Sequence, residues 1–261
     1  MGNNFKFYTE NKLDDNGTYS FTSADEDLAN YLYDNNYSTR LLSVGSNDTI
    51  DEVYIITLGS TSTISAVGLF NHNLKDFDVK YSDDNQITWY DFSVPINETT
   101  NTDAYNFYSF TEVSSVTDIK LTGYTTQIAN QQKSIGQFRA IDLIGEVSTN
   151  PYNIDISYNE NSVIHPLSDG GNVYVQFGSK IYMMIDFDNA TEADLVIFRE
   201  LKNRYAPFFA HPNGGLSTRT QEPFRVQDMF LVNYINPYSP NLKNGYLLDI
   251  GTEISLELQE V

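Results

Sequence analysis

The sequence predicts a mainly β protein in two domains, an N-terminal β-sandwich and a smaller C-terminal α+β domain with one helix on an antiparallel sheet. The chain has 261 residues, which is more than one ordinary small domain contains. Short segments rich in β-branched and aromatic residues dominate the first part, a pattern typical of a β-sandwich. Of the eight prolines, only Pro95 precedes residue 150. We therefore place the domains at 1–148 and 149–261, joined by the polar turn Ser148-Thr149-Asn150-Pro151.

In the first domain, one helix is expected before the strands. Ser23 and Glu26 have the spacing of a capping box, and Leu28, Tyr31 and Leu32 follow on one helical face. The predicted strands are short and separated by polar turns. They are Val53–Leu58, Thr63–Phe70, Phe77–Tyr81, Ile87–Phe92, Tyr105–Phe110, Asp118–Gly123 and Phe138–Ile144.

The second domain combines a hairpin, a helix and further strands. Val173–Phe177 and Ile181–Phe187 read as a β-hairpin through Gly178-Ser179. Thr191 and Asp194 form a second capping pair at the start of an amphipathic helix, Thr191–Tyr205, which Pro207 ends. The remaining predicted strands are Phe208–Ala210, Gln227–Ile235 and Glu253–Val261.

The charge of the chain excludes some classes of partner. Acidic residues number 35 and basic residues 15, so the net charge is −20. Nucleic acid and anionic membrane surfaces are repelled by such a field, and we expect neither as a partner. Cysteine is absent, which rules out disulfides, cysteine–zinc sites and thiol catalysis. No apolar run approaches the ~18 residues of a membrane span, and no export signal is expected at the N-terminus.

Nothing in the sequence favours catalysis, and we expect a protein that is not an enzyme. The histidines His72, His165 and His211 have no second histidine or acid at metal-ligand spacing. Acid pairs such as Asp83-Asp84, Asp25/Asp27 and Asp186/Asp188 are interpreted as turn, strand-end and helix-start residues. A glycoside-processing enzyme stays open as a third possibility, because it needs only two carboxylates that face each other in a cleft.

The segment Tyr33–Arg40 is a candidate metal site. It gathers Asp34, Asn36, Ser38 and Thr39 in a tight polar loop directly after the predicted helix. Calcium binds 6–8 oxygens from carboxylates, amides and carbonyls, and such a loop supplies several. The alternative is a solvated turn in which Asp34 and Asn36 bond to their own backbone.

The order of these segments resembles the discoidin-type, galactose-binding-like jelly rolls. The helix, Leu32–Arg40, Val53–Ser60 and Thr63–Val67 carry the resemblance, with the later Val79–Trp89 and Leu143–Gly145. It spans roughly residues 15–147 and implies a jelly-roll β-sandwich that binds glycans. It also implies calcium at Asp34, Asn36 and Thr39, and no other cofactor. Calcium-binding members commonly carry an acid near the end of the last strand, where this chain has Ala140 and, two residues later, Asp142.

A second resemblance concerns bacteriophage virion proteins. Ala66–Leu74 is similar to a strand end in their jelly-roll domains, where His72 and Asn73 would close a turn. The resemblance implies a structural component of a phage-like tail or baseplate, made in the host cytoplasm and located in the virion with other virion proteins. The alternative is a carbohydrate-binding protein that recognises a host cell-surface glycan. Exposed aromatic residues at loop tips would favour this alternative, and a flat polar tip face would favour assembly.

Self-association is expected through the second domain. The stretch Pro207–Pro240 mixes aromatic residues with glycine and few charges. Such a composition is typical of an interface core, and so long a stretch is uncommon as a loop with no role. The chain is therefore expected to form a homo-oligomer.

Overall fold

The structure is a computed structural model that describes residues 5–14, 17–36, 38–45, 47–148, 151–166, 172–204, 206–211, 230–234 and 252–260. Its contacts divide the chain into two compact units. We call Asn11–Leu143 the sandwich unit. The other unit joins Met1–Glu10 to Ile144–Val261, and we call it the split unit because two separate segments of chain build it.

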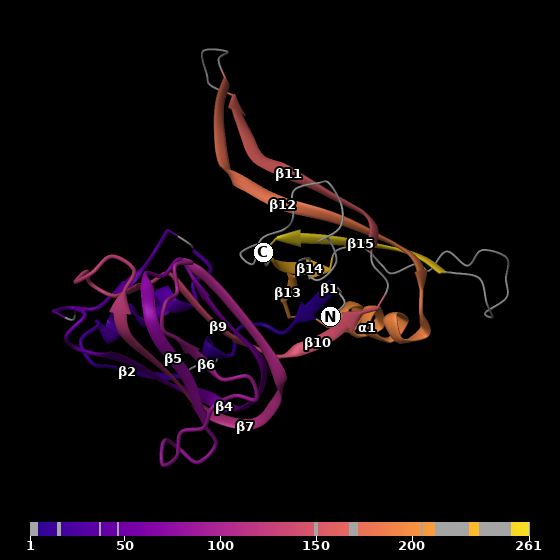
Figure 1. Ribbon diagram of the computed structural model, residues 1–261. Coiled ribbons are helices and arrows are strands. Elements are labelled where there is room, and N and C mark those ends of the chain that lie inside the picture. The colour runs from indigo at the N-terminus through magenta and orange to yellow at the C-terminus, as the bar shows by residue number, and fades with distance from the viewer. Residues whose placement is uncertain are drawn as a thin grey trace. The chain divides into compact units, whose positions relative to one another are not determined.

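The sandwich unit is made almost entirely of antiparallel strands (Figure 1). Its main sheet has the strand order β2-β4-β7-β5-β6, with β9 paired to β4, and β3 pairs with β8 in a small second sheet. The elements are η1 (Lys12–Asp14), β2 (Thr18–Phe21), η2 (Glu26–Leu32), β3 (Leu41–Leu42), β4 (Glu52–Phe70), β5 (Leu74–Ser82), β6 (Ile96–Glu98), β7 (Tyr105–Thr126), β8 (Ser134–Ile135) and β9 (Gln137–Ile141).

Two long strands hold this unit together. β4 and β7 pair from Glu52 opposite Gly123 to Phe70 opposite Tyr105, with register shifts between Thr57 and Ala66. Such irregularities bend a strand. The first half of β4 lies between β2 and β7, and its last half lies between β9 and β7. The two halves of the bent sheet therefore enclose a common core.

That core follows from the alternation of side chains along the strands. On β4, Tyr54 and Ile56 are buried, and on β5 Phe77 and Val79 are buried. They belong to one apolar cluster. Burying a large apolar side chain contributes about 1.5–3 kcal/mol, so this cluster is the main stabilising element of the sandwich unit.

The structure corrects several predicted elements of this unit. The predicted strands Val53–Leu58 and Thr63–Phe70 are parts of the single strand β4. Ile87–Phe92 is not a strand, although Tyr90 makes an isolated bridge to Tyr81. The predicted helix is the 3-10 helix η2, and Asp25 caps it instead of Ser23.

Ser23 has a different partner from the one that the capping-box pattern predicts. Its backbone amide and hydroxyl both donate to the buried carboxylate of Glu52, at 2.9 and 2.6 Å. A buried carboxylate must be hydrogen-bonded, and Ser23 meets this need. The capping pattern therefore failed because Ser23 satisfies a group on β4.

In its described residues, the split unit consists of a seven-stranded sheet and one α-helix (Figure 1). The strand order is β10-β1-β13-β14-β15-β12-β11. The elements are β1 (Phe5–Tyr8), β10 (Leu143–Val147), β11 (Pro151–Pro166), β12 (Asn172–Ala190), α1 (Glu192–Asn203), β13 (Phe208–His211), β14 (Phe230–Tyr234) and β15 (Thr252–Glu260). The predicted α+β class is confirmed.

The hairpin of this unit lies elsewhere than predicted. β12 runs unbroken through Gly178-Ser179, and its partner is β11. A register shift opposite Ser179 marks the place of the predicted turn. Gly178 therefore lies near an irregularity within a long strand. A glycine inside a strand often marks such an irregularity.

The predicted capping box of the helix is confirmed. The Thr191 hydroxyl accepts from the Asp194 amide, and the Asp194 carboxylate accepts from the Thr191 amide at 2.9 Å. Phe198 and Leu201, two apolar residues of the predicted amphipathic helix, are fully buried. Tyr205, the last residue of the predicted helix, lies outside the described residues.

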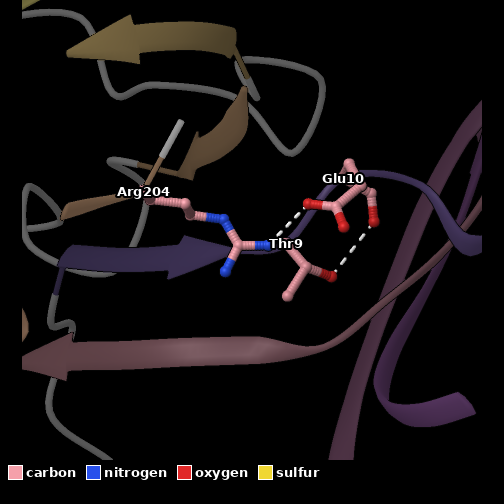
Figure 2. Close-up of polar contacts among 3 residues, drawn as sticks. All are labelled: Thr9, Glu10 and Arg204. Carbon is pink, nitrogen blue, oxygen red and sulfur yellow. Dashed lines mark hydrogen bonds and ion pairs between the residues drawn. The ribbon is translucent and has the colours of Figure 1, made fainter. Parts of the chain in front are cut away.

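The first strand belongs to the split unit. Lys6, Phe7 and Tyr8 of β1 pair with β13. Directly after the strand, Glu10 accepts from Arg204, the residue that caps the end of α1, at 2.6 Å (Figure 2). The contacts thus divide the chain at Glu10 and Leu143 rather than at 148/149. That either domain folds alone stays a prediction.

Within the described part of the chain, α1, η1 and η2 all lack the length and apolar composition that a membrane crossing requires.

A truncation in β1 tests the division into units. Phe7 is fully buried, with its ring 5.9 Å from that of Phe208. Phe7→Ala removes a buried ring at a cost of about 3–5 kcal/mol, and we expect faster amide hydrogen exchange in β13 and β14 only. The matched change Phe77→Ala should accelerate exchange in β4 and β7 only. Loss of protection in β4 and β7 upon Phe7→Ala would assign β1 to the sandwich.

The buried His72 predicts a pH dependence of the sandwich unit. Its Nε2 lies 2.7 Å from Asn106 Oδ1, and its Nδ1 accepts from the Leu74 amide, so the ring is neutral. Burial lowers the pKa of His72 from 6.5 to about 4. The unfolded chain therefore binds a proton in this range that the folded chain does not, and the free energy of unfolding falls as the pH drops from 6.5 towards 4.

The loss amounts to about 3 kcal/mol in all, at 1.36 kcal/mol per pKa unit. It is measured by urea unfolding at a series of pH values, followed through amide exchange in β5 and β7. His72→Gln should remove most of the slope above pH ~5, where few carboxylates titrate. His211→Gln, a change in the split unit, should leave the slope of the sandwich intact. An unchanged slope in His72→Gln would contradict the prediction.

Candidate functional site

The structure brings the three predicted calcium-site residues together. Asp34 follows the end of η2, and its Oδ2 accepts from the Thr39 hydroxyl at 2.7 Å. Its Oδ1 accepts from the Asn36 amide at 2.8 Å. The Asn36 carbonyl oxygen lies 2.8 Å from the Thr39 hydroxyl. The loop is therefore a compact group of oxygen atoms around one carboxylate.

A fourth residue, which the sequence did not indicate, completes this loop. Gln137 is the first residue of β9, and it is fully buried. Its amide nitrogen donates to the Tyr31 carbonyl at 3.0 Å and to Asp34 Oδ1 at 2.6 Å, and it lies 3.4 Å from the Asn36 carbonyl. Its amide oxygen accepts from the Asn35 backbone at 3.1 Å.

The strand register explains why sequence reasoning missed Gln137. The family resemblance places the expected acid near Ala140 and Asp142. In the structure Ala140 pairs with Val67 and is fully buried in the apolar core. The position beside the loop belongs to Gln137, and only the pairing of β9 with β4 places it there. No local signal in the sequence marks it.

A calcium ion and the Gln137 amide nitrogen would need the same space in this loop. Calcium–oxygen distances are about 2.3–2.6 Å, so an ion bound to the Tyr31 and Asn36 carbonyls and to Asp34 would compete with the Gln137 amide nitrogen for one space. In this arrangement the loop does not fit a cation. Among the described residues, no group of three or more acidic or histidine side chains could hold a metal either. Calcium binding at Asp34, Asn36 and Thr39 stays a prediction for experiment.

The other acidic candidates have structural contacts. Asp84 Oδ1 accepts from the Ser82 hydroxyl and from the Thr88 amide, at 2.7 and 2.9 Å, and so closes the turn after β5. Asp25 caps η2. Asp186 lies within β12.

The three histidines lie in different elements of the chain. His165 lies within β11, and its side chain is outside the described part. Buried His211 belongs to β13, and His72 makes the core contacts given above. Next to it, Asn73 links loops, since its Oδ1 accepts from the Ser134 amide and its Nδ2 donates to the Gln132 carbonyl.

A different group of side chains forms the strongest candidate for a binding surface. Residues of β5 and β7 that alternate with the buried ones point to the outer face of the sheet. Lys80 pairs with Lys120 there, and Asp78 lies two residues before Lys80. The loop after β5 places Trp89 on this face, with the Lys120 ammonium group 4.5 Å from the centre of its ring. We call Asp78, Lys80, Trp89, Lys120 and Tyr124 the Trp89 face.

The charged groups of the Trp89 face are partly buried and act on one another. The Lys80 ammonium lies 3.5 Å from Asp91 and 3.9 Å from Asp78. Burial, and next the Asp78 carboxylate, raise the pKa of the Tyr124 hydroxyl. Burial lowers the pKa of the Lys120 ammonium. These groups are held close to an aromatic ring in a fixed arrangement.

The loop that carries Trp89 also exposes other large side chains. Its turn is held by Asp84 and by Asn85 and Gln86, both of which have positive φ angles. Gln86 also donates to Asp118 at 2.9 Å. Beyond the turn the exposed fraction is 82% for Ile87 and 40% for Tyr90. Tyr90 bridges back to Tyr81, with the two rings 5.6 Å apart, so the large apolar side chain that the loop exposes most is Ile87.

Comparisons with known proteins give likenesses of fold over about half of the chain. No family model matches the chain, and no curated protein matches its sequence. A chitosan-binding module from a chitosanase/glucanase of Paenibacillus sp. IK-5 is similar at 18% identity and a TM-score of 0.41, covering 50% of this chain and 98% of the module.

Two further structures are similar to the same degree. A family 32 carbohydrate-binding module of Clostridium perfringens NanJ, in complex with galactose, matches at 14% identity and a TM-score of 0.41, covering 52% of this chain and 99% of the module. A GH29 fucosidase of Ruminococcus gnavus, in complex with fucose, matches at 15% identity and a TM-score of 0.41 over 51% of this chain and 26% of the enzyme.

Proposed function

We propose that the sandwich unit binds a carbohydrate on the Trp89 face and that it does so without catalysis. The observation that carries the proposal is the partly exposed indole of Trp89 among polar groups on an open sheet face. This proposal adopts the alternative function expected from the sequence.

The chemistry of the face suits a sugar ring. One side of a sugar ring presents C–H groups, which pack against an aromatic ring as other apolar groups do. Its rim presents hydroxyls, which donate to carboxylates and accept from ammonium groups. Asp78 and Asp91 supply acceptors and Lys80 supplies a donor beside the indole. Each part of a sugar thus has a matching group.

The charges of the face favour a neutral sugar. Lys80 lies within 4 Å of Asp78 and Asp91, and the Asp78 carboxylate also acts on Lys120, while the whole chain carries −20. An anionic glycan would approach against this field. We therefore infer that the ligand is a neutral glycan.

Hydrolysis is a poorer fit to the same residues. A glycosidase needs two carboxyl groups about 5–10 Å apart with the glycosidic bond between them. The Lys80 ammonium group lies within 4 Å of both the Asp78 and the Asp91 carboxylates. Both carboxylates therefore interact with the same cation instead of facing a glycosidic bond.

The expected role in a phage-like particle stays a prediction. It includes the location in a virion, other virion proteins as partners and self-association. Most of the stretch Pro207–Pro240, on which self-association was predicted, lies outside the described residues. The similar structures do not bear on it.

Fluorescence gives a direct test of the glycan proposal. Trp89 is the one tryptophan of the chain, beside 19 tyrosines, so emission excited selectively at the indole reports on this face alone. We expect a neutral oligosaccharide, chosen by screening a glycan array, to shift or quench that emission with a saturable dependence on concentration. If no glycan binds, or if binding leaves the emission unchanged, the proposed site is wrong.

Variants separate this site from the rest of the sandwich. Trp89→Ala should weaken binding about 30-fold or more, because a central tryptophan typically contributes about 2 kcal/mol or more. Binding by this variant is measured by isothermal titration calorimetry. The control is Tyr105→Ala, which removes a partly buried ring at the other end of β7 and should leave affinity unchanged. Equal losses in both variants would point to unfolding instead of a site.

A further inference from the structure

We propose that the side-chain amide of Gln137 takes the place of a metal ion. It binds the oxygen atoms of Tyr31, Asp34 and Asn36, so that these residues keep their arrangement without calcium. The inference is independent of glycan binding. A calcium loop is expected to present only oxygen ligands, whereas this loop has the Gln137 side-chain nitrogen among its oxygens.

The position of the nitrogen carries the inference. Gln137 Nε2 is the donor to Asp34 Oδ1 and to the Tyr31 carbonyl, and it faces the Asn36 carbonyl at 3.4 Å. Backbone carbonyls and a carboxylate that converge on one point are the acceptors that a cation needs. An N–H group that lies at this point satisfies the same acceptors with hydrogen bonds.

The hydrogen-bond network fixes which end of the amide faces the loop. The oxygen of Gln137 accepts from the Asn35 amide at 3.1 Å, while its nitrogen faces acceptors only. If the amide were flipped, its oxygen would face three other oxygens and its nitrogen would face an N–H group. Every one of these contacts would then be repulsive, so the orientation is determined.

Burial makes these contacts strong. Gln137 is fully buried, and a hydrogen bond to a charged group is shorter and stronger than one between neutral groups. The amide spans 103 residues of sequence to reach Asp34. The amide thus connects β9 to the loop after η2. A bound ion would make the same connection.

Replacing the side-chain nitrogen of Gln137 by an oxygen should turn the loop into a calcium site. In Gln137→Glu an oxygen replaces the N–H donor, and two carboxylates then face the carbonyls of Tyr31 and Asn36 with no donor between them. Two carboxylates held this close together repel each other. A calcium ion would remove the repulsion and would gain the two carboxylates that its charge requires.

The experiment compares melting temperatures of the full chain with chelator and with millimolar calcium chloride. For the wild type we expect equal values. For Gln137→Glu we expect a lower value than the wild type in chelator, and an increase of about 5 °C or more with calcium. Gln127→Glu is the matched control, because the Gln127 amide donates to the Asp103 carbonyl and not to a carboxylate. It should show no response to calcium.

Three outcomes would overturn the inference. A wild type stabilised by calcium would mean that an ion displaces the amide. A Gln137→Glu protein without a calcium response would mean that the oxygens do not form a cation site. An equal response of Gln127→Glu would reveal unspecific binding by an acidic chain.

If Gln137→Glu does not fold, spectra of the wild type still show whether the amide or an ion occupies the loop. In a nitrogen-15 NMR spectrum, the side-chain NH₂ signals of Gln137 should be protected from exchange and unmoved by calcium. They are assigned by their loss in Gln137→Met. Signals that exchange rapidly, or that shift with calcium in a saturable way, would refute the proposal.

Discussion

The pairing of β4 with β7 is the constraint on which the sandwich unit depends. These strands stay in register from Glu52 to Phe70 except for the irregular stretch between Thr57 and Ala66. Because the pair bends there, two strands supply both halves of the sheet, and β2, β5 and β9 add to them. The alternation along the bent pair decides which side chains are buried and which form the outer face.

Local patterns in the sequence were sufficient for some of the fold. The capping box at Thr191 depends on residues three apart, and the strand segments depend on alternation over a few residues. The polar stretch Gly59–Ser62 looked like a turn between two strands, yet it is the bend within β4. Ser23 was assigned to a cap because its partner Glu52 lies 29 residues away. Where a distant group competes for a residue, a local pattern cannot show the outcome.

Each of the two candidate sites combines residues that are close in the sequence with residues that are distant in it. Asp34, Asn36 and Thr39 are neighbours in the chain, so their spacing alone indicated a group of oxygens. Gln137 comes to them through the register of β9. The sequence indicates Trp89 only through the family resemblance and not as a binding residue. The groups around it, such as Lys120, lie on another strand. Sites built across strands require the pairing to be known.

The course of the chain also sets the order in which its parts can form during synthesis. β1 lies between β10 and β13, so its partners are 143–147 and 208–211. The ribosome releases the whole sandwich, Asn11–Leu143, before either partner exists. The first strand can therefore meet β10 only after about 135 further residues are made and β13 only after about 200, at roughly 5–20 residues per second. A nascent chain stalled between residues 147 and 208 would lack the β13 neighbour of β1, and Phe7 would lack its Phe208 contact and be open to chaperones.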